Sequence, residues 1–307
     1  MPRTITPLLA LAGVSMLVSC DRRSARAPEP SEIEDVVRTT TAPIGWMTGA
    51  VASDLVLVEM LCPDDQLPAI WRPNAEMIQT YQRAKLIVMN GAEFEAWAQT
   101  APLPRSRVVS TADAIEGPLL VVSGETHSHG PEGEHAHEEI DGHTWLDPIN
   151  AIAQAGAISE ALREAFPDHA NEFEANRAAL ASRFEALHAR LTAIDTSSVE
   201  IIASESPFGY LARRYDWPTG RIGGDPSSWP NELDTVQRRS SSGEPVAAVL
   251  LCEELPDAET AEMLLDRLGV VAVLWDTGEL AGDRSYIDVV SDNIDRLETA
   301  VADLAQR

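Results

Sequence analysis

The chain has 307 residues, of which 44% are hydrophobic and 23% charged, an ordinary globular composition that is long enough for two domains with cores. Acidic residues outnumber basic residues by 49 to 23, so the formal net charge is −26. A surface this acidic repels phosphate backbones and attracts cations, which argues against nucleic acid as a partner.

The first segment of the chain predicts export with a lipid anchor. After the basic Arg3, an apolar run from Leu8 to Val18 is too short to span a bilayer, and it ends in Leu-Val-Ser before Cys20. This pattern resembles a bacterial lipobox, so we expect residues 1–19 to be a lipoprotein signal peptide and Cys20 to carry the lipid. The alternative is a plain secretory signal in which Cys20 is incidental. In enteric-type lipoproteins an aspartate at the next position, here Asp21, is associated with retention at the inner membrane, so the predicted location is its periplasmic face.

Residues 20–33 have the composition of a flexible tether, and residues 34–148 alternate between strand and helix patterns. This alternation predicts a mainly parallel sheet covered by helices, which we define as the N-terminal lobe. The expected strands are Val36–Thr40, Asp54–Met60, Lys85–Met89 and Arg107–Ser110. The expected helices are a short one from Pro43, Asn74–Arg83 and Ala92–Gln99.

Two helices follow, and then the strand and helix alternation resumes. Residues 149–195 form the predicted connecting and backbone helices, Ile149–Phe166 and Asp168–Ala193, the second with apolar residues at helical spacing. Residues 196–307 form the predicted C-terminal lobe. Its expected strands are Val199–Ala203, a short one near Arg221, Val246–Leu251 and Val270–Leu274, and its expected helices are Phe208–Tyr215, Asn231–Arg239, Asp257–Leu268 and Arg284–Ala305. The fold class is therefore α/β, with two lobes joined by a long rigid helix.

The cysteines other than Cys20 lie in different halves of the chain. Cys62 belongs to the N-terminal lobe and Cys252 to the C-terminal lobe. An oxidising compartment permits a disulfide, but sequence alone does not give pairing geometry. We expect two separate, mostly buried thiols.

A histidine-rich loop spans residues 125–143 and holds five of the seven histidines, namely His127, His129, His135, His137 and His143. Imidazole groups interleaved with carboxylates are typical of a site for a borderline cation such as zinc. The alternative is a solvated loop that happens to be rich in histidine. His143 is considered apart from the other four, because it belongs to the ordered-looking segment His-Thr-Trp-Leu-Asp-Pro.

Two acidic residues occupy positions where α/β proteins bind ligands, beyond the carboxyl ends of strands. Glu205 follows the predicted strand Val199–Ala203, and Asp276 follows the predicted strand Val270–Leu274. Either one alone is equally compatible with a helix-start or turn carboxylate. Together with His143 they predict a nitrogen and oxygen site for a divalent transition metal between the lobes.

Several motifs in this order resemble the zinc/manganese family of ABC-transporter solute-binding lipoproteins. They are the lipobox, NGAEFEAW (Asn90 to Trp97), HTWLDP after the histidine-rich loop, the long helix, SESPFGYLARRY (Ser204 to Tyr215) and VLWDTG (Val273 to Gly278). The resemblance covers nearly all of the mature chain. It implies two α/β lobes joined by a backbone helix, with the metal in the cleft between them and His143, Glu205 and Asp276 as ligands.

The chain departs from the family pattern at the first ligand. Where the family usually has a histidine four residues before the proline of an H-x-Y-x-P segment, this chain has Ala69. Three explanations remain: three protein ligands plus water, a histidine supplied from His127–His137, or loss of the family's binding mode. We favour the second, since the loop can supply imidazole, and Asp64 and Asp65 are alternative donors.

The resemblance favours a binding protein that captures Zn²⁺, or Mn²⁺, and delivers it to an ABC permease of the inner membrane. We expect a monomer attached through Cys20. One alternative is a lipoprotein metal buffer that uses only the auxiliary ligands His127, His129, His135 and His137. A less favoured one is a metallohydrolase, because the chain has no H-E-x-x-H, G-x-S-x-G or phosphate-loop motif and the candidate bases Glu138, Glu139 and Glu253 look solvated.

Overall fold

The computed structural model describes residues 32–128, 134–204, 206–220, 228–239, 241–280, 282 and 284–306. Residues Ile33–Arg307 form one compact unit. The predicted signal peptide, Cys20 and most of the tether lie outside the described residues. Within the described part of the chain, no helix is long and apolar enough to cross a membrane.

The N-terminal sheet is parallel, with the strand order β2-β1-β3-β4. Its strands are β1 (Glu34–Thr39), β2 (Leu57–Met60), β3 (Ala84–Met89) and β4 (Val108–Ser110). Helix α1 (Ala42–Ala52) connects β1 to β2, and α2 (Ala75–Arg83) connects β2 to β3. Because the chain passes to opposite sides of β1, the carboxyl ends of β1 and β3 form the switch point at which such sheets bind ligands.

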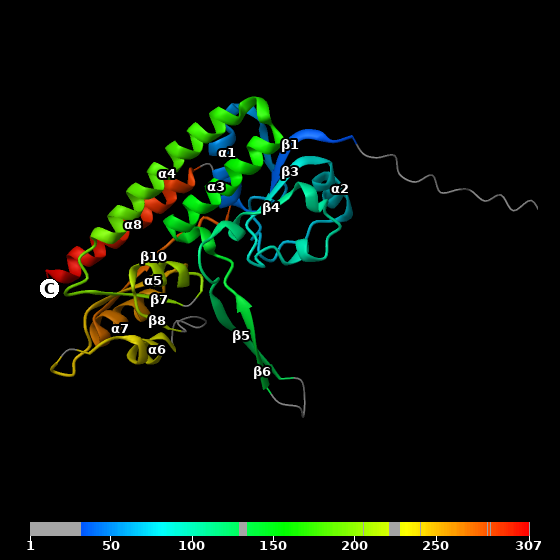
Figure 1. The fold of residues 1–307 in the computed structure, drawn as a ribbon. Coiled ribbons are helices and arrows are strands. Elements are labelled where there is room, and N and C mark those ends of the chain that lie inside the picture. The colour runs from blue at the N-terminus through cyan, green and yellow to red at the C-terminus, as the bar shows by residue number, and fades with distance from the viewer. Residues whose placement is uncertain are drawn as a thin grey trace, which may run out of the picture. The chain divides into compact units, whose positions relative to one another are not determined.

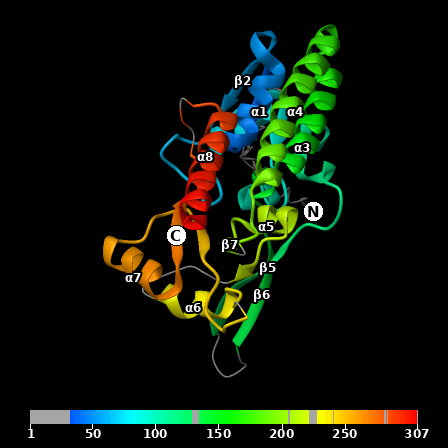
Figure 2. The same cartoon turned by 90° about the vertical axis from the view of Figure 1, so that its left-hand side faces the viewer.

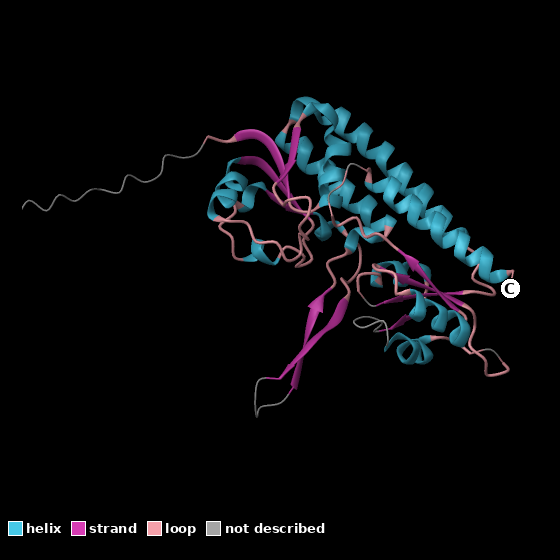
Figure 3. Ribbon diagram, turned by 180° about the vertical axis from the view of Figure 1, so that it is seen from behind, coloured by secondary structure: helices cyan, strands magenta, loops and turns pink. Residues whose placement is uncertain are grey.

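The C-terminal sheet is also parallel, with the order β10-β9-β7-β8. Its strands are β7 (Glu200–Ser204), β8 (Thr219–Gly220), β9 (Ala248–Cys252) and β10 (Val270–Leu274), and its connecting helices are α5 (Gly209–Tyr215), α6 (Trp229–Val236) and α7 (Ala258–Leu268). Every residue of β9 is buried, as expected for a central strand with both faces covered. The predicted pair of parallel sheets flanked by helices is confirmed (Figure 3).

Three long helices carry the core that both sheets share. They are α3 (Pro148–Ala165), α4 (Ala170–Ala193) and α8 (Tyr286–Ala305). Helix α4 packs against α1, α3 and α8 (Figures 1 and 2). One cluster of buried hydrophobic residues includes Val37 and Val88 of the N-terminal sheet together with Val249 and Leu251 of the C-terminal sheet. The long helix was therefore predicted correctly, and its buried face packs into this shared core.

The histidine-rich segment differs from the predicted loop. Its backbone forms two antiparallel strands, β5 (Val121–Ser128) and β6 (Glu134–Ile140), with His127 paired opposite His135. The expectation of an irregular loop over residues 125–143 was therefore wrong for the parts within these strands. The Gly-, Glu- and His-rich sequence lacks the run of β-branched residues that signals a strand, and cross-strand backbone pairing overrides that weak propensity.

A second difference concerns the segment after β3. The predicted helix Ala92–Gln99 is wrong, because Ala92 and Glu93 have positive φ angles of 50° and 61° and only a 3₁₀ turn, Ala96–Gln99, forms. The Glu95 carboxylate accepts hydrogen bonds from the backbone amides of Asn90 (2.7 Å) and Gly91 (3.0 Å). By bonding these preceding backbone amides, the side chain of Glu95 closes a turn. In a helix the same side chain would point away from them.

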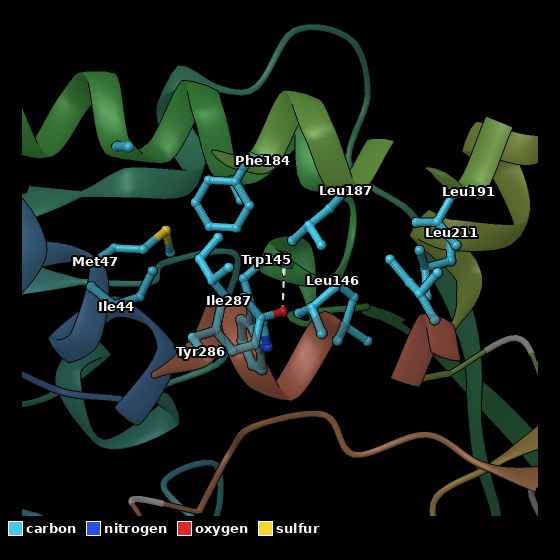
Figure 4. Packing of buried hydrophobic residues seen from close by; sticks show 14 of the residues in the cluster. Ile44, Met47, Trp145, Leu146, Phe184, Leu187, Leu191, Leu211, Tyr286 and Ile287 are labelled. Carbon is cyan, nitrogen blue, oxygen red and sulfur yellow. Dashed lines mark hydrogen bonds between the residues drawn. The ribbon is translucent and has the colours of Figure 1, made fainter. Parts of the chain in front are cut away.

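The shared core predicts a large effect at Phe184, which is 1% exposed and points from α4 toward Ile287 of α8 (Figure 4). Phe184→Ala is expected to reduce the free energy of unfolding by about 3–5 kcal/mol, because it removes transfer energy and leaves a cavity. Urea denaturation of the metal-free protein measures this change. The control is Ile70→Ala, whose side chain is 71% exposed, and which should cost no more than about 0.5 kcal/mol. Equal losses in the two variants would contradict the shared core.

Candidate metal centre

The imidazole of His143 lies between two carboxylates. Its Nδ1 atom is 2.7 Å from Oδ1 of Asp141, and its Nε2 atom is 2.7 Å from Oε1 of Glu279. The backbone amide of His143 also donates to Oδ1 of Asp141, at 3.0 Å. Asp141 and Glu279 are only 2% and 7% exposed. This arrangement fixes the ring and directs Nε2 toward a carboxylate from the C-terminal half of the chain.

Burial and charge act on His143 in opposite directions. Burial by itself lowers its pKa, but the hydrogen bonds to Asp141 and Glu279 and their negative charges outweigh burial and raise the pKa to about 9. In the metal-free state His143 is therefore an imidazolium that neutralises part of the buried negative charge. A divalent cation that replaces the proton on Nε2 would meet Glu279, while Nδ1 keeps its contact with Asp141.

A third carboxylate acts on the same group. Glu253 follows β9, and its side chain is exposed at the surface. Partial desolvation by the surrounding protein raises its pKa, the charges of Glu279 and Asp141 raise it further, and His143 lowers it. Glu253 thus contributes to the negative potential at this site.

Aromatic side chains surround the ring of His143. The ring centroids of Phe94 and Trp145 lie 5.5 Å and 5.4 Å from that of His143, and the two aromatic rings contact each other edge to face at 4.9 Å. Both aromatic residues are buried. They reduce the solvent around the imidazole, which strengthens its electrostatic interactions.

The motif HTWLDP is held by residues that lie far away in the sequence. Trp145 donates through Nε1 to the carbonyl oxygen of Thr277 at 2.9 Å, and Tyr286 donates to the carbonyl oxygen of Trp145 at 3.1 Å (Figure 4). Asp147 caps α3 by accepting from the amide of Ile149. These contacts tie the loop after β10 directly to the segment that contains His143.

The segment SPFGYLARRY holds HTWLDP from another side. Tyr210 of α5 donates to the carbonyl oxygen of Asp141 at 2.9 Å, and Arg214 of α5 pairs with the buried carboxylate of Asp147 at 2.7 Å. Three motifs singled out in the sequence therefore meet around one histidine. The order of these motifs in the sequence does not indicate that they contact one another.

The predicted ligands have different positions. His143 lies at the centre, and Glu205 lies outside the described residues. Asp276 is exposed, and its Oδ1 accepts from the amide of Gly278. Asp276 and Asp64 belong to the lining of a neighbouring hollow of about 440 Å³, and His143 is not among the described residues that line it. The structure therefore brings Glu279 to His143 in the place expected for Asp276.

Sequence reasoning missed Asp141 and Glu279. Both were detectable candidates, since Asp141 lies two residues before His143 and Glu279 lies three residues after Asp276. The choice of Asp276 rested on its position directly after a strand, and only the path of the following turn shows which carboxylate reaches the histidine.

Within the described residues, no further predicted donor joins His143 and Glu279 to form a complete metal site. Ala69 packs against the shared core, and His129 lies outside the described residues, as do the side chains of His127, His135 and His137. Among the described residues, no group of three or more His, Cys, Asp or Glu side chains is arranged to hold a metal ion. Asp141 and Glu279 contact opposite nitrogens of one ring, so they do not converge on a single point.

The two cysteines are buried and unpaired, as predicted. Cys62 and Cys252 are free thiols. Burial raises the pKa of Cys62 to about 11 and the pKa of Cys252 to about 12. Both are therefore protonated at neutral pH and poor metal ligands in this state.

Comparison with known proteins identifies the class that this fold and site define. A family model described as zinc-uptake complex component A, periplasmic, matches residues 37–300. The chain belongs to this family of solute-binding components of metal-uptake transporters, which are not enzymes. The metallohydrolase alternative is thereby excluded, and the resemblance in the sequence is confirmed.

Individual relatives agree with this assignment. The chain is 26% identical over 313 residues to the high-affinity zinc uptake system protein ZnuA of Bacillus subtilis, covering 96% of this chain and 97% of that protein. It is 26% identical to the zinc-binding lipoprotein AdcA of Streptococcus pneumoniae over 96% of this chain, but it spans only 60% of that longer protein.

Solved structures show the same fold. The metal-dependent lipoprotein YcdH of Bacillus subtilis superposes with a TM-score of 0.67 at 22% identity, over 87% of this chain and 99% of that one. Zn(II)-bound AdcA of Streptococcus pneumoniae also gives 0.67, at 21% identity, over 87% of this chain and 58% of that one. The manganese complex of FpvC from Pseudomonas aeruginosa gives 0.66 at 19% identity, over 88% of this chain and 99% of that one.

The raised pKa of His143 predicts a pH-dependent stability. Its ordinary pKa is about 6.5 and its folded value about 9, so the stabilisation from the protonated ring is complete below pH ~6.5 and lost as the pH rises through ~9. Urea denaturation of the metal-free protein in chelator at pH 6, 7, 8 and 9 should show stability falling over this range. In His143→Ala this fall should be much smaller. The same fall in both proteins would show that deprotonation of His143 is not its cause.

Proposed function

We propose that the chain captures Zn²⁺ as cargo at a site that contains Nε2 of His143 and the carboxylate of Glu279, and that it delivers the ion to an ABC permease. The observation that carries the proposal is the direct contact of these two groups at 2.7 Å, with Asp141 fixing the other ring nitrogen. Ligating histidines commonly donate their second N–H to a carboxylate in this manner.

A small movement of the side chains would give Nε2 of His143 and the carboxylate of Glu279 the spacing of two ligands of one zinc ion. Zinc bonds of about 2.0–2.2 Å in tetrahedral geometry place two ligand atoms ~3.4 Å apart. His143 and Glu279 therefore need to separate by less than ~1 Å once the shared proton is lost. Replacing this proton by a divalent cation adds one positive charge, which neutralises more of the buried negative charge of Asp141 and Glu279.

Glu205 is proposed as a further ligand, because it directly follows β7, the strand next to β9 in the C-terminal sheet. A histidine supplied from His127–His137 is proposed to replace the imidazole that Ala69 cannot provide. Asp64, which lines the neighbouring hollow, and the adjacent Asp65 are the alternative donors. The ion would then have mixed nitrogen and oxygen coordination, which fits a divalent transition metal.

Zinc is preferred to manganese for two reasons. Nitrogen and oxygen sites of given geometry bind zinc more tightly than Mn²⁺, since affinities follow the order of the first-row divalent metals. The relatives with the most extensive sequence similarity described above are named for zinc uptake or zinc binding. Manganese is the second candidate, because a site with more carboxylates than imidazoles also suits it.

Zinc calorimetry with matched alanine variants tests the site. His143→Ala and Glu279→Ala should each weaken the tightest zinc binding by more than about tenfold, because direct ligands contribute more than the outer partners, whose loss costs 10- to 100-fold. Asp276→Ala, three residues from Glu279 in the same turn, is the matched control and should change affinity less than about threefold. The reverse ranking of Glu279→Ala and Asp276→Ala would restore Asp276 as the ligand.

The same zinc titration, made on one more variant, separates a receptor from a metal buffer that uses only the histidines of the segment His127–His137. In this variant His127, His129, His135 and His137 are all replaced by glutamine. A receptor retains tight binding that still depends on His143, although one lost ligand weakens it. A buffer loses all binding in this variant and is unaffected by His143→Ala.

The same proposal includes attachment to the membrane through Cys20 and function as a monomer. The attachment is supported by the lipobox ahead of Cys20 and by a relative named as a lipoprotein. Cells supplied with labelled palmitate should incorporate label into the wild-type chain and not into Cys20→Ala, because the thiol carries the acylated group. Equal labelling of both chains would exclude Cys20 as the attachment point.

A further inference from the structure

The side chain of Asn90 contacts the residues on both sides of His143. Its Nδ2 group donates to the carbonyl oxygen of Gly142 at 2.8 Å, and its Oδ1 atom accepts from the hydroxyl of Thr144 at 2.9 Å. Asn90 and Thr144 have no exposed surface. One amide at the carboxyl end of β3 therefore fixes the backbone ahead of the histidine and the side chain behind it.

Gly142 makes this close approach possible. A Cβ atom at this position would lie 2.8 Å from the side chain of Phe94 and 3.1 Å from its Cα atom. The backbone is therefore pressed against Phe94 while its carbonyl oxygen is held by Asn90. The same Phe94 ring packs edge to face on His143, so the turn and the ring are located by one set of contacts.

Glu95 holds Asn90 in turn. Its carboxylate accepts from the amides of Asn90 and Gly91 and from the hydroxyl of Thr40, at 2.7, 3.0 and 2.5 Å. Glu95 is 2% exposed. Burial raises the pKa of its carboxyl group, and its hydrogen-bond donors oppose that shift. The network thus connects the carboxyl ends of β1 and β3 to the turn before His143.

We propose that Asn90, supported by Glu95, is a positioning residue that holds His143 in the orientation required for metal binding. This gives a role to the motif NGAEFEAW. None of its residues is a proposed ligand, and the motif acts on the ion site through His143. The proposal rests on the proposed function, since it assumes that His143 binds the ion. A buried amide satisfied on both its nitrogen and its oxygen has one orientation, and it passes that constraint to its partners.

The test removes the hydrogen bond between Thr144 and Asn90 and leaves the other hydrogen bonds of Asn90 in place. Thr144→Val deletes the hydroxyl but keeps the shape, and Oδ1 of Asn90 still accepts from Gln154 at 3.0 Å. Zinc affinity should fall about tenfold, the lower end of the range for loss of an outer-shell partner. Thr144→Ser, which retains the hydroxyl, should restore most of the affinity.

Two further readouts separate positioning from stability. The visible absorption spectrum of the Co²⁺ form should change in Thr144→Val and return toward wild type in Thr144→Ser, because it reports the geometry at the ion. The unfolding midpoint of the metal-free protein should change no more than in Thr48→Val. Thr48 is a matched control, since it is fully buried and its hydroxyl has no partner among the described residues.

Unchanged zinc affinity in Thr144→Val, or equal weakening in Thr144→Val and Thr144→Ser, would overturn the positioning role. His143→Ala measured in parallel identifies which proposal has failed. If His143→Ala loses affinity while Thr144→Val does not, only the role of Asn90 is wrong. If His143→Ala keeps full affinity, the proposed metal site itself is wrong.

Discussion

The position of His143 between two buried carboxylates is the interaction on which the proposed metal site depends. Asp141 and Glu279 together place two negative charges in a poorly solvated region, which is costly unless a positive charge lies between them. In the metal-free protein that charge is the imidazolium of His143, whose pKa is raised to about 9. A divalent cation would satisfy the same requirement more strongly, which is why we propose this arrangement as part of the ion site.

The structural surroundings of His143 come from several distant segments. Asn90 and Phe94 contribute from the segment that follows β3, Tyr210 from α5, and Tyr286 from α8. None of these residues is a proposed ligand, yet each contacts the turn or ring of the histidine. The sites of binding proteins need such support, because a ligand displaced by about 1 Å loses much of its value.

With Ala69 between β2 and α2, this chain lacks one imidazole that the family pattern implies for its N-terminal half. Ala69 instead packs against the shared core. Of the proposed donors, Glu279 and Glu205 are carboxylates, which shifts the proposed set toward oxygen. The resulting preference for a particular ion therefore depends on the carboxylates of the C-terminal half and on any imidazole that β5 or β6 supplies.

Much of the architecture could be predicted because it depends on local patterns. Continuous apolar runs identified β3, β9 and β10, and helical periodicity identified α4 and α8. The hairpin β5 and β6 was missed, since its pairing is made across the turn and its residues have little strand propensity. The expected helix after Asn90 was wrong because the tertiary position of Glu95 favours a turn over the local helical pattern.

The sequence by itself determined the parallel α/β class, the long helix and the family, and it singled out His143 as a candidate ligand, since each follows from periodicity or from motifs within single segments. Only the tertiary structure decided which carboxylate meets that histidine. Asp276 and Glu279 are three residues apart and equally plausible in sequence, but the turn after β10 exposes the first and buries the second against Nε2. Side-chain direction in an irregular turn depends on packing against distant residues, and sequence spacing does not record it.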